Sequence, residues 1–81
     1  MNINVRFNGA LAQKIGTSRL QVQIQNPGAV SDLINHLQAQ YPQAAPQFKQ
    51  VVPFVAGQHL SLDAPLSDNQ EVALLLPVAG G

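Results

Sequence analysis

The last two residues of the sequence, Gly80 and Gly81, are those whose type and position best suit chemistry. Neither has a Cβ atom, so their backbone can pass through a narrow channel and adopt almost any φ. The four residues after Pro77 can extend about 13 Å, which would let an enzyme act on a carboxylate at Gly81 while it holds the folded domain. A frayed terminus with an incidental glycine pair would arise in about one chain in 200. We therefore interpret Gly81 as the reactive position and Gly80 as part of the segment that presents it.

Side chains that could do chemistry are scarce in the rest of the chain. His36 and His59 are the only histidines, and neither has a partner at metal-ligand spacing. Asp63, Asp68 and Glu71 lie in or beside turn segments, and turn formation explains them better than acid–base catalysis. The absence of cysteine excludes a disulfide, a thiolate metal site and a cysteine nucleophile. We expect no active site within this domain, no metal site and no stably bound cofactor.

The composition also limits the possible partners. Four basic and four acidic residues leave a formal net charge of zero, so the chain lacks the basic patch that phosphate backbones require. No apolar stretch approaches the ~20 residues that span a bilayer, and the first residues do not form an export signal. We therefore expect a cytoplasmic protein that binds neither nucleic acid nor membrane. Its low charge mildly favours an interaction module.

Hydrophobic periodicity predicts two strands and then one helix in the first half of the chain. Apolar and polar residues alternate over residues 2–7 and again over 19–25, as in half-buried strands. Residues 9–16 are expected to form a loop with one or two helical turns. One apolar stripe at helical spacing, which ends before Pro42, predicts an amphipathic helix; it consists of Val30, Leu33, Ile34, Leu37 and Tyr41.

The second half is predicted to contain short strands and turns. Residues 42–50 are expected to form a loop with at most one helical turn, from Pro46. Residues 51–56 form a short apolar strand in which Pro53 favours an edge position or a late start. A brief extended piece at 59–62 and two turns follow, and Asn69 suits a positive φ in the second turn. The last strand covers 71–76.

These elements predict an α+β domain over residues 1–77, with a flexible tail over 78–81. If Val72 and Leu74 face the helix, strand alternation puts Leu75 on the opposite face, beside the tail. We therefore interpret Leu75 as an exposed docking anchor with His59 nearby. The predicted core consists of Ile3, Val5, Phe7, Leu20, Val22, Ile24, Leu33, Ile34, Leu37, Val72, Leu74 and Leu76.

Two stretches of the sequence carry a resemblance to a known family. One is the ending Leu74-Leu75-Leu76-Pro77-Val78-Ala79-Gly80-Gly81, and the other is residues 60–73, with a D-x-P-L turn, an acidic turn and an E-V-A strand. Together they resemble the MoaD/ThiS family of ubiquitin-like sulfur carriers, and most closely the MoaD branch, the small subunit of molybdopterin synthase. The resemblance implies a ubiquitin-like β-grasp fold, with a mixed sheet of four to five strands and one main helix packed on one face.

The resemblance also implies a mechanism and a set of partners. A MoeB-like enzyme would use ATP to adenylate Gly81, and a sulfur donor would convert it to a thiocarboxylate. A MoaE-like large subunit would then receive the tail, and sulfur would pass to a pterin precursor of the molybdenum cofactor. The residues expected to contact these partners are Leu75, His59, Pro77, Val78 and Ala79.

Three alternatives remain open from the sequence. The first is a ThiS-like carrier that supplies sulfur for thiazole and thiamine synthesis. The second is a ubiquitin-like protein modifier that is joined through Gly81 to lysines of target proteins. The third is a plain binding module whose glycine ending is incidental.

Overall fold

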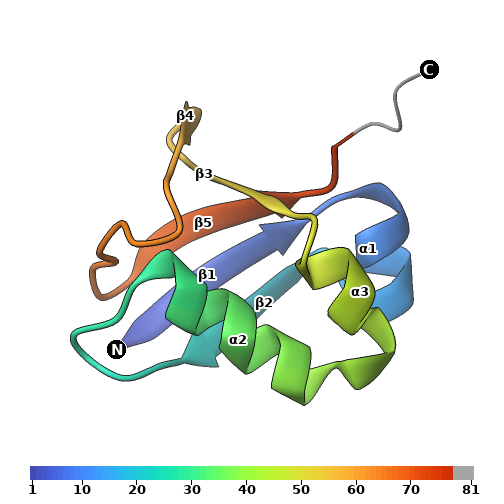
Figure 1. Ribbon diagram of the computed structural model, residues 1–81, viewed down its shortest axis with the longest axis horizontal. Coiled ribbons are helices and arrows are strands. Elements are labelled where there is room, and N and C mark those ends of the chain that lie inside the picture. Colours follow the sequence, from blue (N-terminus) through green and yellow to red (C-terminus); the bar gives the residue numbers. More distant parts are fainter. Residues whose placement is uncertain (78–81) are drawn as a thin grey trace.

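The computed structural model describes residues 1–77, which form nine short helices and strands (Figure 1). The predicted tail, residues 78–81, lies outside the described residues. In chain order the elements are β1 (Asn2–Phe7), α1 (Gly9–Ile15), β2 (Arg19–Gln23), α2 (Val30–Gln40), the 3-10 turn η1 (Pro42–Ala44), α3 (Ala45–Phe48), β3 (Val52–Val55), β4 (Gln58–His59) and β5 (Gln70–Leu75). Among the residues described, no helix is both long enough and apolar enough to cross a bilayer.

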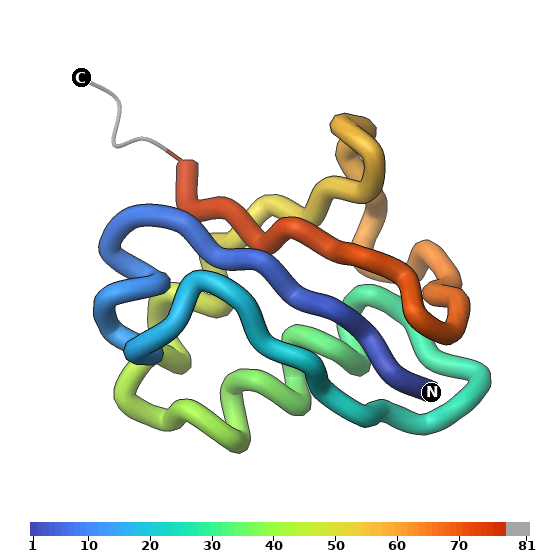
Figure 2. Tube along the Cα trace, turned by 180° about the vertical axis from the view of Figure 1, so that it is seen from behind, coloured from blue at the N-terminus to red at the C-terminus, as the bar shows by residue number. Residues whose placement is uncertain are grey.

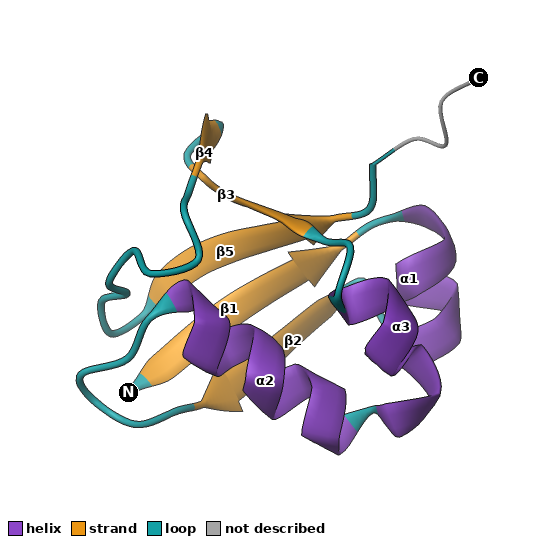
Figure 3. Cartoon of the chain, viewed as in Figure 1, coloured by secondary structure: helices purple, strands orange, loops and turns teal. Residues whose placement is uncertain are grey.

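The five strands form one mixed sheet in the order β2-β1-β5-β3-β4 (Figure 3). The first and last strands, β1 and β5, run parallel in the middle of the sheet, and the other neighbours are antiparallel. The predicted α+β domain with a mixed sheet is therefore confirmed. Because β1 and β5 run in the same direction, both reach the same end of the sheet.

The helices lie on one face of this sheet. The helix α2 runs across the face, and α1 and α3 lie toward one end of it (Figure 1). Seen from behind, β1, β2 and β5 have no helix in front of them (Figure 2). The prediction of one main helix on one face is confirmed, and the opposite face of the sheet is open.

Nine of the twelve predicted core residues are buried between the sheet and the helices. Leu20, Ile24 and Leu76 are only partly buried, because they lie on the edge strand, after it, and after the end of β5. The prediction missed six other buried residues: Leu11, Val30, Ala44, Phe48, Val51 and Leu66. The helical turn expected from Pro46 is present as α3, whereas η1 before it was predicted as loop. Helix α3 packs the Phe48 ring edge-on against Phe7, with 6.0 Å between the ring centroids.

The start of α2 depends on a loop from the other half of the chain. Ala29 precedes the helix and offers no side-chain acceptor, but the Asp32 carboxylate accepts a hydrogen bond from its N–H at 2.7 Å. The N–H groups of Val30 and Ser31, which have no partner within the helix, donate to the carbonyls of Ala64 and Leu62. Backbone groups that follow β4 therefore replace a side-chain cap.

Pro53 was expected to mark an edge strand or a late strand start; β3 does begin one residue later than predicted, at Val52, but the edge position is wrong. Strand β3 lies between β5 and β4, so it has a neighbour on each side. The Pro53 carbonyl accepts a hydrogen bond from Leu60, so its ring nitrogen also faces the β4 side. Strand β4 has only two residues, and the missing N–H of Pro53 falls where that pairing ends. Because β4 is so short, β3 can contain a proline here; a longer neighbouring strand would need the N–H that proline lacks.

Replacing Leu37 with alanine tests the packing of α2. The Leu37 side chain is fully buried, so its removal should lower the free energy of unfolding by about 2–5 kcal/mol. Urea unfolding followed by circular dichroism would measure this change. The matched control is His36→Ala, because His36 is exposed on the same helix. An unchanged urea midpoint for Leu37→Ala would show that α2 does not pack in the core as described.

The turn between β3 and β4 stores strain that a substitution should relieve. Ala56 and Gly57 both have positive φ angles, 51° and 77°, as a type I′ turn requires. Alanine tolerates this region poorly, whereas asparagine adopts it readily. Ala56→Asn should therefore raise the free energy of unfolding by about 1 kcal/mol. The control is Ala10→Asn, at an exposed position within α1, which should lower the free energy of unfolding. If both substitutions change this free energy equally, Ala56 is not strained.

Candidate functional site

The described chain ends just after β5, a central strand of the sheet, and the predicted reactive segment follows from there. Strand β5 ends at Leu75, and the described chain ends two residues later at Pro77, which is exposed. The predicted site residues Val78, Ala79, Gly80 and Gly81 lie outside the described residues. The structure therefore shows where this segment begins: Pro77 lies near the end of β1 and beside the open face of the sheet.

We define the open face as the side of the sheet opposite α2. Its side chains alternate with the buried ones on β1, β2 and β5, and strand register aligns them with residues of β3 and β4. They are mainly Asn4, Arg6, Arg19, Gln21, Val52, Phe54, His59, Glu71, Ala73 and Leu75. The apolar members gather on β3 and β5, close to Pro77.

Leu75 lies on the open face, as the alternation of β5 predicts. Its neighbour Leu74 is fully buried under the helices. Leu75 is only partly exposed rather than fully exposed, because it faces Val52 across the β5–β3 pairing and shares a hollow of about 400 Å³ with Phe54 and Pro77. The hollow is an apolar recess at the base of the C-terminal segment. It suits a hydrophobic side chain of a partner.

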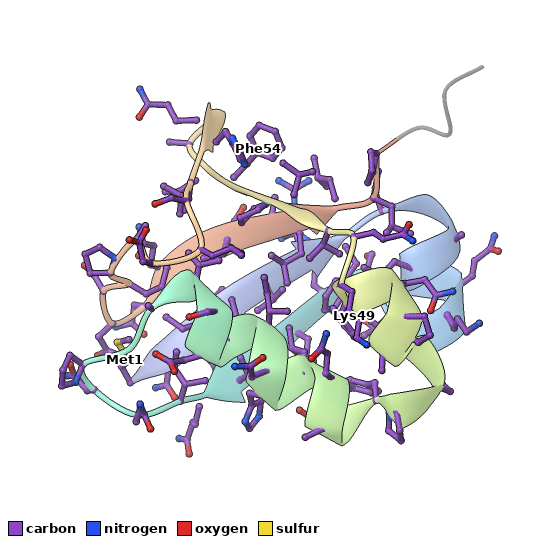
Figure 4. The ribbon with its side chains drawn as sticks, in the orientation of Figure 1. Met1, Lys49 and Phe54 are labelled. Atoms are coloured by element: carbon purple, nitrogen blue, oxygen red, sulfur yellow. The ribbon has the colours of Figure 1, made fainter. Side chains whose placement is uncertain are left out.

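His59 lies on the same face but at its far edge. It pairs with Phe54 across the β3–β4 hairpin, and the two rings lie 5.6 Å apart between centroids. Figure 4 shows Phe54 beside this hairpin, away from the helix layer. Strand β3 therefore separates His59 from Leu75. Phe54 and Val52 were missed as site residues, although the alternation of residues 51–56 could have placed them on one face.

The acidic residues serve structural contacts, as their turn positions predict. The Asp68 carboxylate accepts the N–H of Asn2 at 2.7 Å, and the Asp63 carboxylate accepts the Ser61 hydroxyl at 2.7 Å. Glu71 pairs with Arg6 at 3.4 Å, with both side chains more than half exposed. Within residues 1–77, no three His, Cys, Asp or Glu side chains gather at metal-binding distance.

A second recess lies on the helix side of the sheet. This groove of about 450 Å³ runs between α2, α3 and the segment after β4. Leu62, 57% exposed, lies along it, and Lys49 lies at the end of α3 (Figure 4). The groove lining is mostly apolar and contains no Asp or Glu, so it offers no carboxylate to hold a metal ion.

Comparisons with known proteins agree with this architecture. The sequence profile of the ThiS family matches residues 5–81. The molybdopterin synthase sulfur carrier subunit of Mycobacterium tuberculosis is 33% identical over 82 residues, which cover 100% of this chain and 99% of that protein.

Two solved structures are similar in fold. One is small archaeal modifier protein 1 of Haloferax volcanii, with a TM-score of 0.85 and 18% identity over 95% of this chain and 98% of that chain. The other belongs to the complex of subunits 1 and 2 of the molybdopterin-converting factor of Helicobacter pylori, with a TM-score of 0.70 and 20% identity over 100% of both chains. These likenesses confirm the predicted ubiquitin-like β-grasp fold. The profile match and the full-length similarity to the mycobacterial protein show that this chain belongs to the ThiS family, as its resemblance to MoaD/ThiS proteins predicted.

Proposed function

We propose that this chain is the sulfur carrier subunit of a molybdopterin synthase and acts in the cytoplasm. The observation that carries the proposal is its full-length similarity to the mycobacterial sulfur carrier subunit. The Gly80-Gly81 ending supports it, because the chain has no cysteine that could hold transferable sulfur. The domain binds no cofactor of its own, and its partner supplies the ATP.

The proposed chemistry overcomes the low reactivity of a carboxylate. A MoeB-like enzyme joins the Gly81 carboxylate to the α-phosphate of ATP and releases pyrophosphate, which turns a poor leaving group into AMP. A sulfur nucleophile then attacks the acyl carbon, the C–S bond forms, and the bond to AMP breaks. The product is a thiocarboxylate at Gly81, whose sulfur passes to a pterin precursor within the large subunit.

In this reaction the folded domain provides the surface that an enzyme binds while it acts on Gly81. The segment after Pro77 can extend about 13 Å, so an enzyme that acts on Gly81 must also contact the domain near the end of β5. The open face offers Leu75, Val52 and Phe54 for that contact, and His59 lies at its edge. The solved complex of the Helicobacter pylori subunits supports a MoaE-like large subunit as one partner. The MoeB-like enzyme is proposed from the resemblance to the MoaD/ThiS family, and it would supply the activation that a carboxylate needs.

A ThiS-like carrier for thiazole synthesis is the second candidate, because the matching family bears that name. Both candidates form the same thiocarboxylate and differ only in the molecule that accepts the sulfur. Incubation of the thiocarboxylated protein with either acceptor system would separate them. A protein modifier would instead yield isopeptide-linked species of higher mass.

Changes at Gly81 should abolish sulfur loading and leave the fold intact. Deletion of Gly81, or addition of an alanine after it, removes the carboxylate from its proposed position, and neither change touches the core. After incubation with the adenylating enzyme, ATP and sulfide, the intact mass of the wild type should rise by the exchange of one oxygen for sulfur. Neither variant should show this shift.

The control for this experiment is His36→Gln, an exposed change on α2 that should load like the wild type. The thermal midpoints of all variants should agree. An extended form that accepts sulfur without being trimmed would contradict the carrier proposal.

Leu75→Glu should weaken docking. A carboxylate in the apolar recess beside Val52 and Phe54 would be desolvated on binding, so the affinity for the adenylating enzyme and the large subunit should fall by about 2 kcal/mol or more. Isothermal titration calorimetry would measure both affinities. The matched control is Leu62→Glu, the same substitution at an exposed leucine outside the open face. Equal affinities for the two variants would place the docking surface elsewhere.

A further inference from the structure

Two of the four basic residues of this protein lie directly opposite each other on the open face. Arg6 on β1 and Arg19 on β2 are register partners. Met1 and Ile24 exchange both of their backbone hydrogen bonds, and such pairs alternate along an antiparallel ladder. Five residues further on, the Arg6–Arg19 pair is therefore of the non-hydrogen-bonded type, in which facing side chains lie closest.

The charge of this arginine pair is only partly balanced. Glu71 accepts a hydrogen bond from Arg6 at 3.4 Å, whereas Arg19 makes no ion pair with any described residue. A hollow of about 260 Å³ is lined by both arginines together with Asn4, Gln21 and Glu71. Like charges that face each other across a strand pair destabilise a sheet. The folded domain alone thus gains nothing from Arg19 at this position.

The arginine pair continues into the apolar part of the open face. Strand register forms one row across the sheet, from Arg19 to Arg6, Ala73, Phe54 and His59. Arg6 and Phe54 are two strand spacings apart, about 10 Å, and only the small side chain of Ala73 lies between them. A single flat partner surface can therefore contact the cationic end and the aromatic end together.

We propose that the Arg6–Arg19 pair is a recognition site for a carboxylate side chain of the protein that docks on the open face. This inference rests on the proposed function, which supplies such partners. The incoming aspartate or glutamate pairs with Arg19, and Arg6 bridges it to Glu71. The partner also carries an apolar group two to three strand spacings away, about 10–14 Å, which packs on Phe54 and Leu75. A protein carboxylate fits better than a phosphate group, because Glu71 repels a doubly charged anion more strongly than a single charge.

Reversal of the charge at Arg19 tests this site. In Arg19→Glu the new carboxylate stands opposite Arg6, so the thermal midpoint should stay the same or rise. The dissociation constant with a purified MoaE-like large subunit from the same organism should nevertheless increase about five-fold or more. In Arg19→Gln the affinity should fall less, and it should depend less on salt than that of the wild type.

The matched control is Lys49→Glu, the same charge reversal in the helix layer, which should change the dissociation constant less than about two-fold. Equal effects of Arg19→Glu and Lys49→Glu would overturn the proposal, because they would reflect net charge alone. Unchanged binding in both variants would overturn it as well. If the wild type binds neither the large subunit nor the adenylating enzyme, the proposed function fails, and this inference fails with it.

Discussion

The parallel pairing of β1 and β5 is the interaction on which the rest of this structure depends. It joins the two ends of the described chain in the middle of the sheet, through partners such as Val5 and Val72 that are both fully buried. Parallel strands need a crossover, and here the intervening chain supplies α2, which covers one face. The same pairing brings the end of β5 next to the end of β1. The described chain therefore ends, at Pro77, next to the centre of the sheet and the open face.

Because the helices cover only one face of the sheet, its two faces have different roles. The inner part packs Leu33, Leu37 and Phe48 against the strands and supplies most of the hydrophobic stabilisation. The open face carries three of the eight charged residues of the chain, and the ion pair Arg6–Glu71 on it is too exposed to contribute much to stability. Its apolar recess lies at Pro77, and its arginine pair lies further across the sheet, on β1 and β2. A surface of this kind is better explained by association than by folding.

Much of the fold could be predicted because several signals are local. The apolar stripe from Val30 to Tyr41 predicted the helix that the structure has at Val30–Gln40, since the stripe repeats with the helical period and Pro42 stops it. The positive φ predicted as suitable for Asn69 is likewise confirmed. The errors fell where contacts between distant segments of the chain decide the local structure. Residues 42–50 were predicted as a loop with at most one turn from Pro46, because the short helices η1 and α3 have no period long enough to detect. They are held in place by the packing of Phe48 on Phe7.

From the sequence by itself we could predict the alternation along β1, β2 and β5 and the end of α2 before Pro42, and we interpret Gly80-Gly81 as the most suitable place for chemistry. These conclusions rest on backbone periodicity and residue type, which act over a few neighbours. Only the tertiary structure decided the strand order, the position of Pro53 beside a two-residue strand, and the capping of α2 by carbonyls after β4. It also placed Arg19 opposite Arg6. Strand register, and the face of the sheet that the helices cover, arise from contacts between residues far apart in the chain. A local sequence pattern therefore cannot predict them.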